Sequence, residues 1–311
     1  MTHKETFIQP HWLLGSGEDC KQEFALLISS PGQIEQSLSI VKACLHKENQ
    51  IVDSEKQLSE STFELLFEAT TVKAWDLFQS VLTIADEQGF DISVVPQNHR
   101  TKKLLICDMD STIVASETLD DVAAKVGIGE QVKQITERAM RGELDFRQAL
   151  DERVGLLKGL PEKVFNDIAN EVELNPGAEQ LIKQANANNI KTVLVSGGFE
   201  PIVKVVVDKL GFDRYVCNKL EIKDGQLTGS VIEPIVDAST KLNVLKEECQ
   251  NLNIELHDAC TIGDGANDLP MIEAAGLGIS YYGKPLLRET IPYQINVSDL
   301  KSALTMMGIV S

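Results

Sequence analysis

The sequence is short of basic residues, of paired cysteines and of long apolar runs. Lysine and arginine number 29 against 47 aspartates and glutamates, which gives a formal net charge of −18. Such a balance repels phosphate backbones and anionic lipid, so we expect neither a nucleic acid nor a membrane as a partner. It does not exclude a small anionic substrate, because a local site can hold a metal or basic residues against the overall field.

The six cysteines are scattered without C-x-x-C spacing, and the five histidines form no metal-binding pattern. Zinc sites and disulfide frameworks are therefore not expected. No window reaches the roughly 18 uninterrupted apolar residues of a membrane span, and the amino terminus lacks the basic and apolar segments of a signal peptide. We therefore expect a cytoplasmic protein.

Residues 1–100 are predicted to form one α+β domain. The stretch from 24 to 97 predicts the order β-α-β-β-α-β, and Gly89 closes its second helix. Residues 1–20 show no period and predict an irregular lead-in, while the polar stretch 97–103 predicts a linker. This split βαβ plan resembles the ACT-like domains that bind small molecules, which implies serine as a ligand. A dimerising or merely packing domain fits the same pattern, so serine binding and a homodimer both stay open.

The second part of the sequence changes to nearly continuous apolar strands that alternate with helices. Strands without polar alternation are buried on both faces, which is typical of a parallel sheet in an α/β domain. Ligands of such sheets bind at the carboxyl ends of the strands. We predict a Rossmann-like core with a parallel sheet at 101–116 and 181–311.

Two insertions interrupt this core. The first contains about 70 residues that predict only helices, with helix starts at Asp145 and Pro161, and its size predicts a cap over the site. We assign the helical cap to 117–180. The second insertion is short, and Asp224 with Gly225 predicts a β-hairpin.

Three of the strand ends carry polar residues. Asp108 and Asp110 follow the first strand, Ser196 with Gly197 follows the second, and Asp264 follows a later one. By themselves Asp108 and Asp110 could be solvated carboxylates that cap a loop. Carboxylates so close together repel each other unless one is protonated or a cation lies between them, and hard divalent cations suit oxygen ligands. The strand ends therefore predict a Mg²⁺ site.

These groups suit the hydrolysis of a phosphate monoester. An aspartate beside Mg²⁺ can attack phosphorus and form an aspartyl phosphate. A neighbouring carboxyl group can protonate the leaving alkoxide and later take a proton from water. Ser196, the backbone of Gly197 and Gly198, and Lys241 can hold the phosphoryl oxygens.

The motifs together resemble a known family. DMDST, the serine in VLVSGG, the lysine in STKLNVL, and GDGAND follow the order and spacing of the haloacid dehalogenase superfamily. The resemblance implies Asp108 as the nucleophile, Asp110 as the acid and base, and Mg²⁺ held by Asp108, the Asp110 carbonyl and Asp264. It further implies a set of supporting residues: Ser196, Lys241 and Asn267 near the phosphate, and Asp268 beside the metal or the lysine.

Within this superfamily, DMDSTIVASETLDDVA, MRGELDFRQALDERVGLLKGLP and VSGGF resemble the phosphoserine phosphatases over about 104 to 290. This resemblance implies that O-phospho-L-serine is hydrolysed to L-serine and phosphate, the last step of serine biosynthesis. Glu117 would bind the substrate ammonium and Arg153 its carboxylate, while Met140 and Phe146 would close over the substrate.

Two of these assignments have plainer alternatives. A helix that begins at Asp145 places Arg153 on one face with Phe146 and Leu150, where it could also be an arginine with a packed stem. An acidic residue such as Glu117 in the first turn of a helix usually caps the amino-terminal end of that helix. The runner-up function is a related phosphatase acting on phosphothreonine or phosphohomoserine, and a second alternative is a regulatory protein with a vestigial phosphatase fold.

Overall fold

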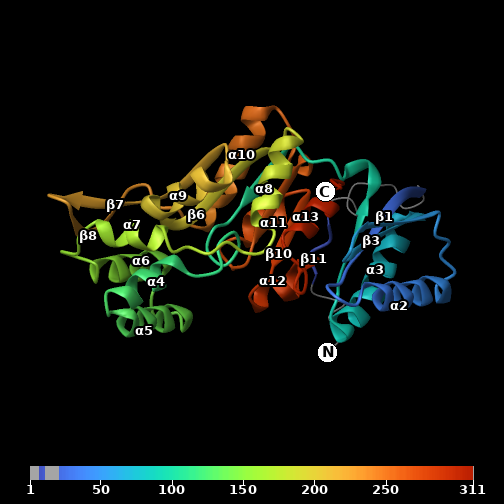
Figure 1. The fold of residues 1–311 in the computed structure, drawn as a ribbon, viewed down its shortest axis with the longest axis horizontal. Coiled ribbons are helices and arrows are strands. Elements are labelled where there is room, and N and C mark those ends of the chain that lie inside the picture. Colours follow the sequence, from blue (N-terminus) through green and yellow to red (C-terminus); the bar gives the residue numbers. More distant parts are fainter. Residues whose placement is uncertain (1–6, 11–20, 311) are drawn as a thin grey trace.

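The computed structural model describes residues 7–10 and 21–310, so most of the predicted lead-in lies outside the described residues. The chain forms two sheets, each covered by helices, with a further group of helices at one end (Figure 1). Within the described residues, no helix is both long enough and apolar enough to cross a membrane.

The amino-terminal sheet has four antiparallel strands in the order β2-β3-β1-β4. The predicted order β-α-β-β-α-β is confirmed, and Gly89 ends the second helix with a φ of 75°. The likeness to ACT domains stays a prediction. The elements are β1 (Lys21–Ser29), α2 (Ile34–Lys47), β2 (Ser54–Ser59), β3 (Thr62–Thr70), α3 (Thr71–Gln88) and β4 (Asp91–Pro96).

Both faces of this sheet are covered. Alternate residues of β1, such as Phe24 and Leu26, pack against α2 and α3, as the period of two in a strand requires. The residues between them, Ala25 and Leu27, belong to a core that continues into α13 (Lys301–Met306). The last helix of the chain thus packs between the two sheets, which also meet where β11 (Tyr293–Ile295) contacts β4 (Figure 1).

The second sheet has seven strands in the order β11-β10-β9-β5-β6-β7-β8, and the pairs are parallel except for β7 with β8. The predicted parallel sheet is confirmed. Its strands are β5 (Leu104–Cys107), β6 (Lys191–Phe199), β7 (Arg214–Lys223), β8 (Gln226–Ile232), β9 (Ala259–Gly263), β10 (Leu277–Tyr281) and β11 (Tyr293–Ile295).

Helices cover both faces of this sheet around its central strand β5, which is why that strand is apolar throughout. Leu105 and Cys107 of β5 face the helices α8 (Ala178–Ala187), α9 (Glu200–Leu210) and α13. Leu104 and Ile106 face the opposite helices, which are α10 (Ala238–Leu252), α11 (Leu269–Ala274) and α12 (Pro285–Thr290). Two short 3₁₀ helices, η2 (Gln97–His99) and η3 (Leu256–Asp258), lie at the opposite end of the strands from the site.

The insertion after β5 contains four helices, as expected for a cap: α4 (Thr118–Lys125), α5 (Gly129–Met140), α6 (Phe146–Gly155) and α7 (Lys163–Ala169). Asp145 starts α6 through a capping box with Gln148. The helix expected to start at Pro161 is present, but α7 begins two residues later, at Lys163. Pro161 instead pairs with Gln226 of β8, in an extended segment that adds to the edge of the hairpin.

The hairpin of β7 and β8 is confirmed. Asp224 and Gly225 both have positive φ values, 52° and 75°, which matches the twist of the flanking strands. Gly159 N donates to Leu227 O at 2.9 Å, so the hairpin also supports the cap.

The polar stretch predicted as a linker is packed between the two sheets. Arg100 is buried against Glu64 of β3 and the Thr305 carbonyl of α13. Lys102 is also buried, and its Nζ donates to the carbonyls of His99 and His257 at 2.8 and 2.7 Å. Burial of these charges together with their hydrogen-bonding partners ties the amino-terminal domain to the core.

Candidate active site

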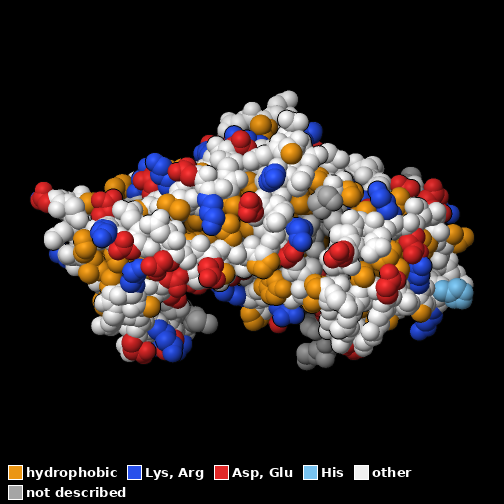
Figure 2. Space-filling view, in the orientation of Figure 1, with side chains coloured by type: hydrophobic (Ala, Val, Ile, Leu, Met, Phe, Trp, Pro, Cys, Tyr) orange, Lys and Arg blue, Asp and Glu red, His pale blue; other side chains and the backbone are white. Residues whose placement is uncertain are grey.

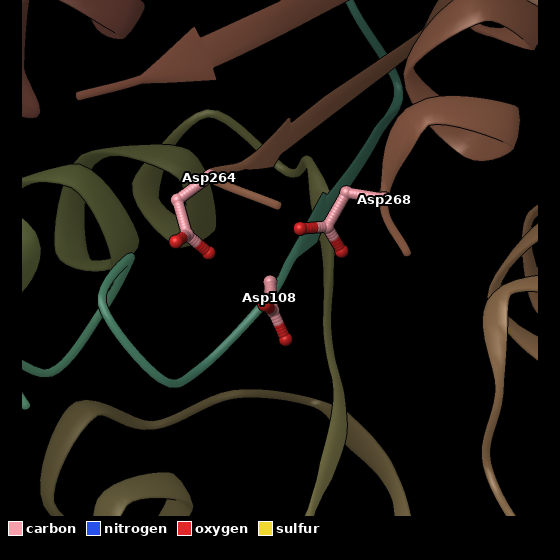
Figure 3. A group of neighbouring side chains, drawn as sticks. All are labelled: Asp108, Asp264 and Asp268. Carbon is pink, nitrogen blue, oxygen red and sulfur yellow. The ribbon is translucent and has the colours of Figure 1, made fainter. Parts of the chain in front are cut away.

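Three carboxylates converge at the carboxyl ends of β5 and β9 (Figure 3). Asp108 follows β5, Asp264 follows the neighbouring strand β9, and Asp268 lies at the start of α11. One carboxylate oxygen from each lies within 4.8 Å of those of the other two, and all three residues are buried. The sequence-based prediction that polar strand ends meet at one edge of the sheet is confirmed for these residues.

Lys241 offsets part of this negative charge. Its Nζ lies 2.7 Å from Asp108 Oδ1 and 2.6 Å from Asp268 Oδ1, and its side chain is 1% exposed. Asp268 Oδ2 accepts a further hydrogen bond from Gly265 N. Burial would lower the pKa of Lys241, but the two aspartates outweigh it and raise that pKa, so the lysine is charged.

Asp108 is a buried carboxylate beside other charged groups. Burial raises its pKa well above the ordinary value, Asp268 adds to the rise, and Lys241 opposes it. Among the described residues only Oδ1 of Asp108 takes part in an ion pair, and its Oδ2 has no such contact. An unpaired oxygen of this kind can act as a nucleophile or bind a cation.

Asp110 is held by hydrogen bonds that its carboxylate accepts. Its Oδ1 accepts a hydrogen bond from Thr118 N at 3.0 Å, and its Oδ2 lies 3.5 Å from Ser196 Oγ. Burial raises the pKa of Asp110 to about 6, although the Thr118 N–H lowers it. A carboxyl group with such a pKa can give and take protons near neutrality.

The end of β6 presents backbone rather than the serine side chain to the pocket. Ser196 is fully buried, and its Oγ accepts a hydrogen bond from Gly198 N at 2.8 Å. The N–H of Gly198, expected to hold a phosphoryl oxygen, is therefore occupied by Ser196. Gly197 and Gly198 line the pocket, and an added Cβ on Gly198 would lie 3.2 Å from Asp110 Oδ2.

Asn218 is a site residue that the sequence reasoning missed. It is fully buried in β7, and its Nδ2 donates to Gly197 O at 2.7 Å. Its Oδ1 accepts a hydrogen bond from Val236 N at 2.8 Å. An asparagine inside the strand-like stretch RYVCNKL is the one signal for it in the sequence. Its amide fixes the carboxyl end of β6.

A single pocket brings core and cap together. Figure 2 shows a hollow between the lobe of cap helices and the part of the core that carries α12. Ser196 and Lys241 lie behind the pocket wall, and the side chain of Met140 lies outside the described residues. The wall is made of Asp108, Asp110, Glu117, Leu119, Phe146, Leu150, Arg153, Gly197, Gly198, Phe199, Asp264, Asn267 and Lys284.

Arg153 faces this pocket from α6. Its Nε donates to Ala149 O at 3.1 Å, and no other hydrogen bond from its guanidinium is seen among the described residues. Burial lowers the pKa of Arg153, although Asp120 and Glu117 oppose the change. The predicted apolar stripe is present, since Leu150 is buried while Phe146, 42% exposed, lies at the pocket wall. The free donors of Arg153 suit a carboxylate.

Glu117 does not serve the helix end. It occupies the N-cap position of α4 but makes no side-chain capping hydrogen bond. Its Oε1 instead accepts from Ser111 Oγ at 3.1 Å and from Lys284 Nζ at 3.3 Å. No side-chain hydrogen bond from Glu117 therefore caps α4, and the residue lines the pocket.

Lys284 is the second residue that the sequence reasoning missed. Its Nζ lies 3.0 Å from Asp264 Oδ2, and its backbone N donates to Asp264 O at 2.8 Å. Burial raises the pKa of Asp264, and Lys284 opposes that rise. No quoted motif contains this lysine, because it follows β10 rather than one of the polar strand ends.

Known proteins share both the fold and the site-bearing region. A family model for haloacid dehalogenase-like hydrolases matches residues 105–273. A phosphoserine phosphatase of Streptococcus thermophilus is 44% identical over 206 residues, which is 66% of this chain and 96% of that protein. A HAD family hydrolase of Salmonella enterica serovar Typhi has a TM-score of 0.83 at 29% identity, covering 91% of this chain and 98% of that one. A substrate-bound phosphoserine phosphatase complex has a TM-score of 0.62 at 38% identity, covering 66% and 98%. The chain therefore belongs to the haloacid dehalogenase-like hydrolases and, within them, to the phosphoserine phosphatase family.

Proposed function

We propose that this enzyme hydrolyses O-phospho-L-serine to L-serine and phosphate, the last step of serine biosynthesis. One observation carries the proposal: Glu117 and Arg153 of the cap line the same pocket as the strand-end aspartates. A carboxylate and a guanidinium are the partners that the ammonium and carboxylate of an amino acid require. The relatives named above as phosphoserine phosphatases support the same substrate.

In the proposed reaction, Asp108 attacks phosphorus and the bond to the serine oxygen breaks. Asp110 gives its proton to that leaving oxygen, so serine departs as a neutral alcohol. Asp110 then takes a proton from water, which attacks the aspartyl phosphate and releases phosphate and free Asp108. The fixed charge of Lys241 beside Asp108 offsets the negative charge that gathers during both steps.

We further propose Mg²⁺ as the cofactor. The free Oδ2 of Asp108, the carboxylate of Asp264 and the backbone carbonyl of Asp110 are oxygen donors of the kind that Mg²⁺ prefers. Asp268 is already committed to Lys241 and Gly265, so it supports Lys241 rather than the ion. When bound, Mg²⁺ would supply positive charge against the phosphoryl oxygens.

Phosphate release from phosphoserine, measured with Mg²⁺ and with a chelator, tests the proposal. We expect turnover that the chelator abolishes. Asp108→Asn keeps the shape of the side chain but removes the nucleophile, and should reduce turnover by at least about 1000-fold. Asp258→Asn, at the other end of β9, is the matched control and should keep activity. Turnover of Asp108→Asn near that of the control would contradict the assignment.

Phosphothreonine and phosphohomoserine belong in the same substrate panel, since a higher kcat/KM on either would replace phosphoserine as the substrate. Serine binding by the amino-terminal domain, a homodimer and a cytoplasmic location stay predictions. Titration calorimetry with serine and sedimentation of the full chain measure the first two.

A further inference from the structure

Lys284 joins the two parts of the pocket. Its ammonium lies 3.0 Å from Asp264 Oδ2 in the core and 3.3 Å from Glu117 Oε1 at the start of the cap. Asp264 and Glu117 are the residues that the proposed function assigns to Mg²⁺ and to the substrate ammonium. One lysine therefore contacts two acids that are each expected to receive a different cation.

The backbone fixes the position from which this lysine reaches the acids. Lys284 is the N-cap residue of α12, Pro285 follows it, and its N–H is bonded to the carbonyl of Asp264. Gly283 packs so closely that an added Cβ would lie 2.0 Å from Ser280 Oγ. The stem of Lys284 is thus held beside Asp264, although the side chain is 58% exposed. The ammonium group can leave toward solvent without any movement of the backbone.

The balance of charge explains why a cation is needed at this position. Lys241 is shared between Asp108 and Asp268, so it does not neutralise Asp264. Asp264 is buried, and without an ion its charge would face that of the other carboxylates within 4.8 Å. Lys284 supplies the missing positive charge from the opposite side.

We propose that Lys284 is a built-in counter-ion that occupies Asp264 in the metal-free enzyme and competes there with the divalent cation. The inference rests on the proposed function, because it takes Asp264 as a metal ligand. Lys284 is then a positioning residue that keeps the acids in place while the ion is absent. Cation binding must displace its ammonium from Asp264, so the lysine weakens the affinity for the ion while it stabilises the empty site.

Calorimetric titration of Mg²⁺ into the substrate-free chain tests this competition. Lys284→Met keeps the apolar stem and removes the charge, and we expect it to bind Mg²⁺ about tenfold more tightly than the original chain, since a partly screened charge a few ångströms from a ligand has an effect of that order. Lys284→Arg restores the positive charge and should bind Mg²⁺ more weakly than Lys284→Met. Unchanged or weaker binding by Lys284→Met overturns the proposal.

Lys103→Met is the matched control for the change in net charge. Lys103 lies 3.0 Å from Asp258 and is 59% exposed, so it resembles Lys284 in both respects, but it lies at the opposite ends of β5 and β9. Its variant should bind Mg²⁺ as the original chain does. An equal gain in both variants would show an effect of overall charge and would also overturn the proposal.

Thermal unfolding gives a second and independent readout. Without Mg²⁺, Lys284→Met should unfold at a lower temperature than the original chain, because Asp264 loses its counter-ion. Saturating Mg²⁺ should then raise the unfolding temperature of the variant by more than that of the original chain. An equal rise in both overturns the competition. Failure of the proposed function looks different: the original chain would bind no Mg²⁺, or would bind it without hydrolysing phosphoserine.

Discussion

The buried contact of Lys241 with two aspartates gives the sharpest prediction for stability. Lys241→Met removes the ammonium group that lies beside both Asp108 and Asp268. The side chains of these aspartates are 7% and 0% exposed. Methionine fills a similar volume, so the change acts mainly through charge. Breaking a buried ion pair by removal of one partner typically costs about 3–5 kcal/mol, and we expect a loss in that range. Phosphate release should fall below detection as well.

The loss should depend on pH in a definite direction. Burial already raises the pKa of Asp108, and without Lys241 this pKa rises further. A carboxyl group whose pKa is higher in the folded state than in the unfolded state loses stabilisation as the pH rises through that range. The difference in unfolding free energy between Lys241→Met and the original chain should therefore be larger at pH 8 than at pH 5.

Urea unfolding at both pH values measures these differences, with phosphate release as a separate assay. Lys241→Met combined with Asp268→Asn should recover part of the lost stability, because one buried charge is gone, but should recover no turnover. Lys103→Met is the control for removal of a lysine from an exposed ion pair and should change stability by less than about 1 kcal/mol. A loss below about 1 kcal/mol for Lys241→Met, equal at pH 5 and pH 8, would refute the reasoning.

Three other substitutions address specificity, the carboxyl end of β6 and the junction between the two sheets. Arg153→Ala should raise KM for phosphoserine by at least about tenfold but hardly alter kcat/KM for an aryl phosphate, and equal losses would remove its role with the carboxylate. Asn218→Leu frees Gly197 O and should lower kcat/KM about tenfold for both esters, whereas unchanged kinetics would contradict that role. Burial lowers the pKa of Lys102 from 10.5 to about 8, so between pH 8 and pH 10 its deprotonation should stabilise the folded chain relative to Lys102→Met by up to about 3 kcal/mol in urea unfolding. A difference that does not change with pH would show that Lys102 does not titrate there.

The fold could be predicted where local patterns and tertiary packing agree. Residues 104–107 are apolar at every position because helices cover both faces of the strand, so the sequence indicates a parallel sheet. Asp145 with Gln148, and Asp224 with Gly225, are local signals whose geometry depends on few distant contacts. Elements that depend on their neighbours were harder to predict. Pro161 has the residue type of a helix start, but its segment pairs with the hairpin.

The residues of the site also divide into those that local patterns predict and those that depend on distant contacts. Asp108, Asp110 and Asp264 follow strands, and parallel topology is enough to bring strand ends together. The contacts of Lys284 and Asn218 could not be predicted from any pattern of residue types in the sequence. Lys284 reaches Asp264 from the loop after a different strand, and Asn218 reaches Gly197 across a pair of strands. Their roles follow from distances between atoms in the folded chain.

The overall charge of −18 is compatible with an anionic substrate because lysines offset part of the charge of the pocket's acids. Lys241 lies between Asp108 and Asp268, and Lys284 lies between Asp264 and Glu117, so each lysine offsets part of the charge of two carboxylates. Arg153 differs from both lysines, since its guanidinium has no carboxylate within ion-pair distance among the described residues. The pocket therefore combines acids whose charge is partly offset with an unpaired cation in the cap. This arrangement of charges favours a substrate that carries an anionic group in addition to its phosphate. A simple phosphate monoester lacks such a group.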